Sequence, residues 1–119
     1  MLYKDMVVWK VAREIVKEVY AHADRFPSNE RYGLGNQLRR ASVSIASNIA
    51  EGKYRNTRKE YARFVSMALA SAVEVECQLH LAIATNIIRT DITPLLRKVG
   101  KEISMLINLR KKLTLNNPL

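Results

Sequence analysis

The feature that most constrains this chain is a long segment, residues 64–88, that carries almost no charge. Its only charged side chains are Glu74 and Glu76. The preceding Thr57-Arg58-Lys59-Glu60 has the spacing of a capping box, which predicts a helix over residues 57–86. At 1.5 Å per residue this helix is about 43 Å long. A helix that is apolar nearly all round is buried on more than one side, so other helices must surround it.

Three further amphipathic helices are predicted from apolar residues that recur at helical spacing. The first covers residues 4–25 and ends before Pro27, since a residue before proline is pushed out of the helical region. The second covers 36–51, with Gly52 interpreted as its C-cap. The last follows Thr93-Pro94, a cap residue and a proline suited to the first helical position.

The connections between these helices are short, which places successive helices antiparallel. The predicted fold class is therefore all-α, an antiparallel up-down-up-down four-helix bundle. A chain of 119 residues suits one domain, 1–119. Only four glycines and three prolines are present, too few for the many turns of an all-β fold.

The sequence offers little for catalysis. One cysteine, Cys77, excludes a disulfide within the chain and a thiolate metal site, and we interpret it as a small buried hydrophobe. The two histidines, His22 and His80, fall on different predicted helices. There is no glycine-rich phosphate loop and no pair of Glu-x-x-His motifs. We expect no catalytic residues, no metal, no cofactor and no enzymatic activity.

The location follows from the absence of targeting signals. Charges interrupt the first residues, so no signal peptide is expected, and no uncharged apolar run of ~18 residues predicts a membrane span. We expect a cytoplasmic protein.

The positive charge is concentrated in two segments. Residues 53–63 and 97–112 carry net charges of +4 and +5, which together equal the +9 of the whole chain. The bundle topology brings the first segment and the end of the second to one pole, while acidic residues offset Arg25, Arg31 and Arg89 at the other. The candidate nucleic-acid-binding residues are Lys53, Tyr54, Arg55, Arg58, Lys59, Arg63, Arg110, Lys111 and Lys112.

A localised basic excess indicates an anionic partner, and phosphate contacts with Tyr54 as a stacking group favour RNA or DNA. The alternatives are a solvated face without a ligand, and a protein-interaction scaffold that recruits a nucleic-acid enzyme.

The second and third helices carry more apolar surface than one bundle needs, which predicts a homo-oligomer. The alternative is that alanine-rich faces tolerate water. Arg40 and Glu74 are the charges expected to be buried, in a structural pairing helped by Asn48.

Several motifs together resemble the four-helix-bundle proteins encoded in intervening sequences of bacterial 23S ribosomal RNA genes. The resemblance covers about residues 2–113, and the matching elements are residues 5–10, 26–34, 37–41, 44–45, 48–52 and 68–79. It implies a ring-like homopentamer of four-helix bundles. The family also looks distantly similar to the basic pentameric accessory protein of diversity-generating retroelements, which works with a reverse transcriptase. No catalytic residue is known in the family that could be carried over.

Overall fold

A computed structural model of the chain describes residues 1–115. A short 3-10 helix, η1 (Tyr3–Asp5), precedes α1 (Val7–Ala23) and the single turn α2 (Ser28–Arg31). The long helices α3 (Leu34–Lys53), α4 (Arg58–Ala84) and α5 (Thr93–Leu115) follow. The described residues contain no strand.

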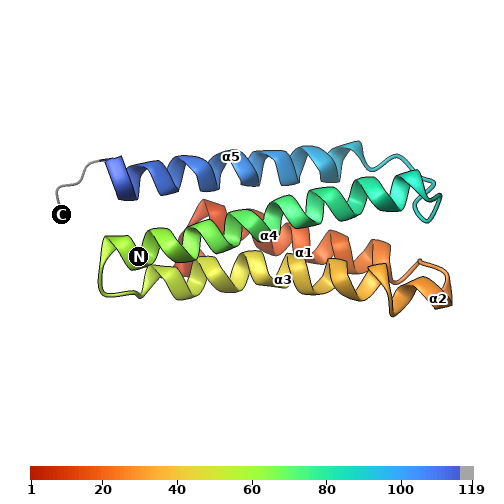
Figure 1. Cartoon of the computed structure of the whole chain (residues 1–119), viewed down its shortest axis with the longest axis horizontal. Helices are drawn as coiled ribbons and strands as arrows, with labels where there is room; N and C mark the ends of the chain where they lie inside the picture. The colour runs from red at the N-terminus through yellow and green to blue at the C-terminus, as the bar shows by residue number, and fades with distance from the viewer. Residues whose placement is uncertain (116–119) are drawn as a thin grey trace.

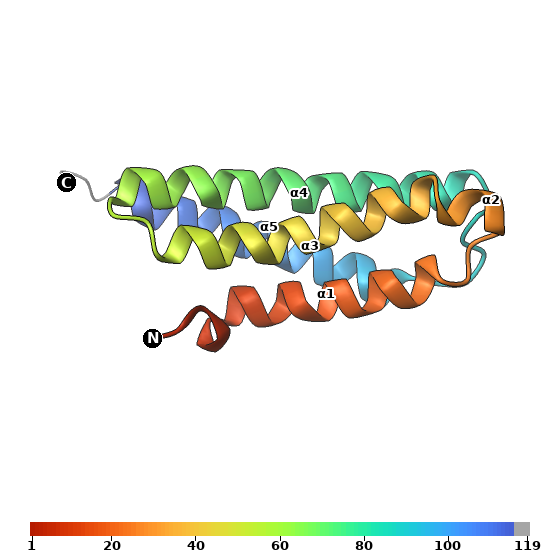
Figure 2. The same ribbon diagram turned by 90° about the horizontal axis from the view of Figure 1, so that it is seen from below.

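The four long helices run alternately up and down a rod of 50 × 21 × 20 Å (Figure 1). Each packs against two others, in the cyclic order α1, α3, α4, α5. Figure 2 shows the rod from a second side, with α1 beneath α3. This confirms the predicted antiparallel four-helix bundle.

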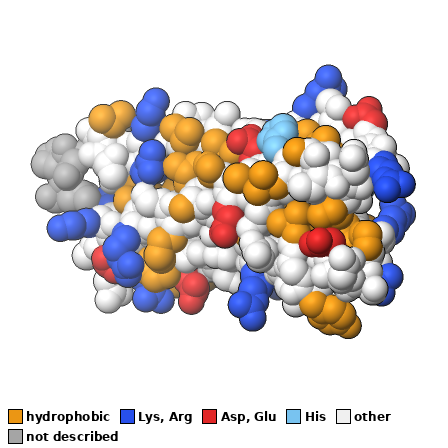
Figure 3. Space-filling model, turned by 45° about the vertical axis from the view of Figure 1, so that its right-hand side comes forward, with side chains coloured by type: hydrophobic (Ala, Val, Ile, Leu, Met, Phe, Trp, Pro, Cys, Tyr) orange, Lys and Arg blue, Asp and Glu red, His pale blue; other side chains and the backbone are white. Residues whose placement is uncertain are grey.

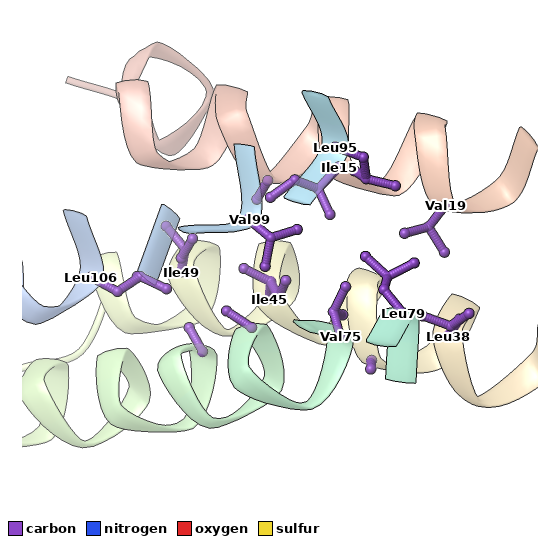
Figure 4. Close-up of a cluster of buried hydrophobic side chains, with 14 of the residues drawn as sticks. Ile15, Val19, Leu38, Ile45, Ile49, Val75, Leu79, Leu95, Val99 and Leu106 are labelled. Carbon is purple, nitrogen blue, oxygen red and sulfur yellow. The ribbon is translucent and has the colours of Figure 1, made fainter. Parts of the chain in front are cut away.

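The core runs along the axis and is almost entirely aliphatic. Ile15 of α1, Ile45 of α3, Val75 of α4 and Val99 of α5 are fully buried and point toward one another (Figure 4). Burying each such side chain contributes about 1.5–3 kcal/mol relative to leaving it in water. Elsewhere in the core the helices carry small buried side chains, which let the backbones approach closely: Ala12, Ala41, Ala68 and Ala72.

Helix ends follow the sequence with two differences. Thr57 caps α4 as predicted: its Oγ1 accepts a hydrogen bond of 3.1 Å from the Glu60 amide. The Glu60 carboxylate, however, binds Arg63 instead of closing the capping box. Gly52 does not end α3; the helix continues through it to Lys53. Gly52 is buried because the backbone there lies against α4. Glycine is therefore needed at this position for close packing of the two helices and not to cap α3.

By length and composition, α4 is the one described helix that could cross a membrane. An 18-residue window in it has a mean hydropathy of 1.3, and 39% of that window is buried inside the bundle. Core helices of soluble proteins pass the same test, and α4 packs between α3 and α5.

Two expectations about burial are wrong for the single chain. The side chains of Arg40 and Glu74 are exposed and form no ion pair with each other. Cys77 is also exposed. The reason is geometric: α4 is apolar on its outward face as well as on its inward face, so periodicity could not show which side faces solvent.

Smaller polar side chains join α3 to α4. The Asn48 amide donates to Ser44 Oγ at 3.0 Å, and the Ser71 hydroxyl donates to the same Ser44 Oγ at 2.8 Å. Further along, Gln78 Nε2 lies 3.4 Å from Gln37 Oε1. Asn48 therefore binds Ser44 of its own helix and does not take part in the expected pairing of Arg40 with Glu74.

Candidate nucleic-acid interface

One end of the rod gathers three parts of the chain: η1, the loop between α3 and α4, and the last turns of α5 (Figure 1). The ring of Tyr3 meets the ring of Tyr54 edge to face, with centroids 6.3 Å apart. The Arg58 guanidinium donates a hydrogen bond to the backbone carbonyl of Lys112. We call this end, with its nine candidate residues from Lys53 to Lys112, the basic pole.

Two arginines of the basic pole lie over one aromatic ring. The guanidinium carbons of Arg55 and Arg63 are each 4.9 Å from the centre of the Phe64 ring. Arg63 also binds Glu60, with Nε 3.1 Å from Oε2. This hydrogen bond lowers the pKa of the Glu60 carboxyl and raises the pKa of Arg63. The charge of Arg63 is therefore compensated locally.

The other candidate residues of the basic pole differ in how exposed they are. Lys53 and Arg110 are half-buried, and Arg110 lies 3.4 Å from Ser66 Oγ. Tyr54 is 55% exposed, and its ring meets that of Tyr3 edge to face. The remaining five cations are exposed and, within residues 1–115, form no ion pair: Arg55, Arg58, Lys59, Lys111 and Lys112.

A second basic surface, which we call the α1/α5 groove, was not predicted. Lys10 and Arg13 of α1 face Arg97 and Lys101 of α5 across a groove of about 370 Å³. Residues 97–101 belong to the basic segment 97–112, but they lie near the start of α5 and not at the pole. The groove depends on α1 and α5 being lateral neighbours, which charge counting along the chain does not reveal.

Ion pairs reduce the charge of the α1/α5 groove. Arg13 Nε lies 3.1 Å from Glu14 Oε2, and Lys98 binds Glu18 across the two helices. Both pairs lie close to the groove, so the basic pole remains the stronger candidate for binding phosphates.

Apolar side chains are also exposed in several patches between groups of Lys and Arg (Figure 3). On α4, Val73 is 47% and Leu81 51% exposed, and Val43 on α3 is 40% exposed. A contiguous exposed apolar surface is typical of an interface, and these side chains are the candidates for one.

Together these features define an antiparallel four-helix bundle with cations gathered at one end and apolar side chains exposed on two helices. The chain matches the model of the 23S rRNA-intervening sequence protein family over residues 4–109, and it belongs to that family.

One solved structure is a protein of unknown function from the S23 ribosomal protein family of Bacteroides thetaiotaomicron VPI-5482. It is 23% identical to this chain, with a TM-score of 0.79, and the match covers 88% of this chain and 99% of that one. At this identity the likeness shows the shared fold alone. No curated protein matches the chain.

Proposed function

We propose that this protein is a non-enzymatic, cytoplasmic RNA-binding module that acts as a homo-oligomer and is not attached to a membrane. The observation that carries the proposal is the basic pole. Five exposed cations from two distant segments converge there beside the exposed Tyr54, and within residues 1–115 none of them forms an ion pair. Cations placed in this way bind phosphates, and an exposed aromatic ring stacks on unpaired bases.

The test is a charge reversal at the pole. We expect the triple variant Arg55→Glu, Arg58→Glu, Lys59→Glu to lose at least tenfold in affinity for short structured RNA at low salt. The logarithm of the affinity should also depend less steeply on the logarithm of salt concentration, because each lost phosphate contact reduces the slope by about 1. Fluorescence anisotropy with RNA that carries 5′-hydroxyl ends measures both quantities, and duplex DNA serves as the comparison ligand.

The matched control reverses three exposed cations outside both the basic pole and the pocket at the opposite end: Lys10→Glu, Lys17→Glu, Arg40→Glu. This variant has the same net charge as the pole variant, so equal losses in both would mean that only net charge matters. Binding by the parent that does not change between low and physiological salt would contradict the proposal. No binding even at low salt would favour a protein-interaction scaffold.

The oligomer is tested separately, through the apolar side chains on the outward face of α4. We expect the parent to have a mass several times the 13.6 kDa of one chain, with five copies as the family resemblance implies. The variant Val73→Asp, Leu81→Asp should dissociate, since two charges in an interface are costly to desolvate. Light scattering at micromolar concentration measures the mass, and Val7→Asp, an exposed valine on α1, is the control. A parent with the mass of one chain would refute the oligomer.

A further inference from the structure

A second site lies at the end of the rod opposite the basic pole, where the end of α1 meets the loop between α4 and α5. A pocket of about 370 Å³ opens there, within the size range of small-molecule sites. Its floor and walls include His22, Arg25, Phe26, Ile87, Arg89 and Thr90, and none of its lining residues is acidic.

The loop that forms one wall is held rigidly by the end of α4. Asn86 adopts a left-handed backbone conformation with φ of 61°, and its amide donates to the Ile83 carbonyl at 3.1 Å. The next amide, of Ile87, donates to the Ala82 carbonyl at 2.9 Å. These two bonds form a Schellman motif, for which asparagine is a suitable residue. Arg89 follows directly, and its Nε donates to the Asn86 carbonyl, so its side chain is held against this loop.

The opposite wall comes from the end of α1 and is equally well fixed. Phe26 is only 2% exposed, and its carbonyl accepts a hydrogen bond of 3.1 Å from Arg31 Nε. His22 lies half-buried one turn before it. The pocket therefore has a rigid apolar floor beneath polar walls.

The acidic residues expected to offset the arginines of this pocket form their contacts elsewhere. Asp24 is bound to Arg39 of α3, with oxygen and nitrogen 3.0 Å apart. Asp91 accepts a 2.9 Å hydrogen bond from the Thr93 amide at the start of α5. Within residues 1–115 neither Arg25 nor Arg89 forms an ion pair.

The charge environment of His22 agrees with this picture. Burial lowers the pKa of the imidazole, and the positive charge of Arg25 lowers it further, while Glu18 on the same helix opposes the effect. Arg89, which lines the same pocket from the loop, adds a second positive charge.

We propose that this pocket binds a phosphate monoester, with Arg25 and Arg89 on the phosphate and its organic group against Phe26 and Ile87. A monoester carries about −1.5 to −2 charge at pH 7, which matches two guanidinium groups. Arginine also binds phosphate through two parallel hydrogen bonds. The ligand is either a free nucleotide or the 5′-phosphate at the end of a nucleic acid strand. The site is distinct from the basic pole and does not depend on the function proposed for that pole.

The two histidines allow a direct test by NMR. Inorganic phosphate and adenosine monophosphate are titrated into the protein while the ring resonances of His22 and His80 are followed. We expect saturable shifts at His22 and a higher His22 pKa in the complex, because a bound anion favours the imidazolium form. His80 is exposed on α4, six residues before Asn86, and does not line the pocket, so its resonances should shift much less than those of His22.

Variants and strands identify the contacts and the source of the ligand. Arg25→Ala, Arg89→Ala should weaken binding at least tenfold, whereas Arg97→Ala, an exposed arginine on another face, should not. Both arginines of the double variant are exposed, so the fold should be kept. Reversal of the basic pole should leave the binding of adenosine monophosphate unchanged, which separates the two sites.

Two outcomes support the proposal. Saturable binding of adenosine monophosphate at His22 identifies a free nucleotide as a ligand. Tighter binding of a 5′-phosphorylated oligonucleotide than of its 5′-hydroxyl counterpart identifies the end of a nucleic acid strand. Equal shifts at both histidines would overturn the proposal. So would the absence of a saturable shift at His22 with inorganic phosphate, adenosine monophosphate and the phosphorylated strand.

Discussion

Replacing Glu102 by leucine is expected to stabilise the fold by several kcal/mol at pH 9 and by much less at pH 5. Glu102 is fully buried on the inward face of α5, between Val99 and Leu106. Within residues 1–115 neither of its carboxylate oxygens has a hydrogen-bond partner. Burial raises the pKa of this carboxyl to about 8, and Lys101 only partly opposes the effect.

The sign of the pH dependence follows from the two pKa values of Glu102. Its ordinary value is 4.5 and its value in the fold is about 8. Below pH 4.5 the carboxyl is protonated in the folded and unfolded chains, and it adds no pH-dependent cost. Between these values unfolding releases a proton, so the free energy of unfolding falls as pH rises. Above pH 8 the loss is complete, at roughly 5 kcal/mol from 1.36 kcal/mol per pKa unit.

Chemical denaturation of the parent, Glu102→Gln and Glu102→Leu at pH 5, 7 and 9 measures the effect. In both variants the free energy of unfolding should fall much less between pH 5 and pH 9 than it does in the parent. The leucine variant should be the more stable of the two, because glutamine leaves a buried amide without partners. Glu51→Gln, at an exposed carboxylate, is the control. A parent whose stability is equal at pH 5 and pH 9 would refute this account.

The burial of Glu102 could not be predicted from the sequence. Its neighbours Lys101 and Lys98 are surface cations, so the carboxylate looked like part of a charged surface segment and was counted against the basic charge. Helical geometry instead turns Glu102 toward the core together with Val99 and Leu106. Because the buried carboxyl is largely protonated at pH 7, it offsets little of the positive charge of α5.

The features that were predicted correctly are those encoded locally. The Thr57 cap, the break before Pro27 and the helical periodicity each depend on neighbouring residues, and short loops then determine the up-and-down order. This order was enough to bring the α3–α4 loop to the end of α5. The α1/α5 groove and the pocket beside His22 depend instead on which helices are lateral neighbours and on which acids are already paired, and neither is local.

The exposed face of α4 was missed for a different reason. A helix that is apolar on several sides has no unique inward direction, so Glu74 of α4 was assigned to the interior, with Arg40 of α3 as its expected partner. The bundle buries the α4 stripe that contains Val65, Val75 and Leu79, and it leaves Val73 and Leu81 outside. Only packing against its two neighbours, α3 and α5, decides between these faces.

Replacing Gly52 by valine is expected to cost roughly 3 kcal/mol of stability, and by alanine about 1–2 kcal/mol, in the range of overpacked cores. A Cβ atom at residue 52 would lie 2.8 Å from Phe64 Cβ and 3.2 Å from Tyr61 Cδ1. The Phe64 Cβ is attached directly to the α4 backbone, so the two helices must separate to admit it. Relief of the glycine's helix penalty, about 1 kcal/mol, offsets part of the alanine clash.

Gly100 provides the matched control, since it also lies inside a helix and a Cβ there would have no neighbour within 4 Å. Gly100→Ala should therefore stabilise the protein by up to about 1 kcal/mol, opposite in sign to Gly52→Ala. Chemical denaturation at pH 7 compares the two, and equal effects would show that the contact between α3 and α4 is not tight. Separation of these helices would also displace the Phe64 ring, over which Arg55 and Arg63 lie. RNA affinity should therefore fall in Gly52→Ala at temperatures where the variant is still folded, and should be unchanged in Gly100→Ala.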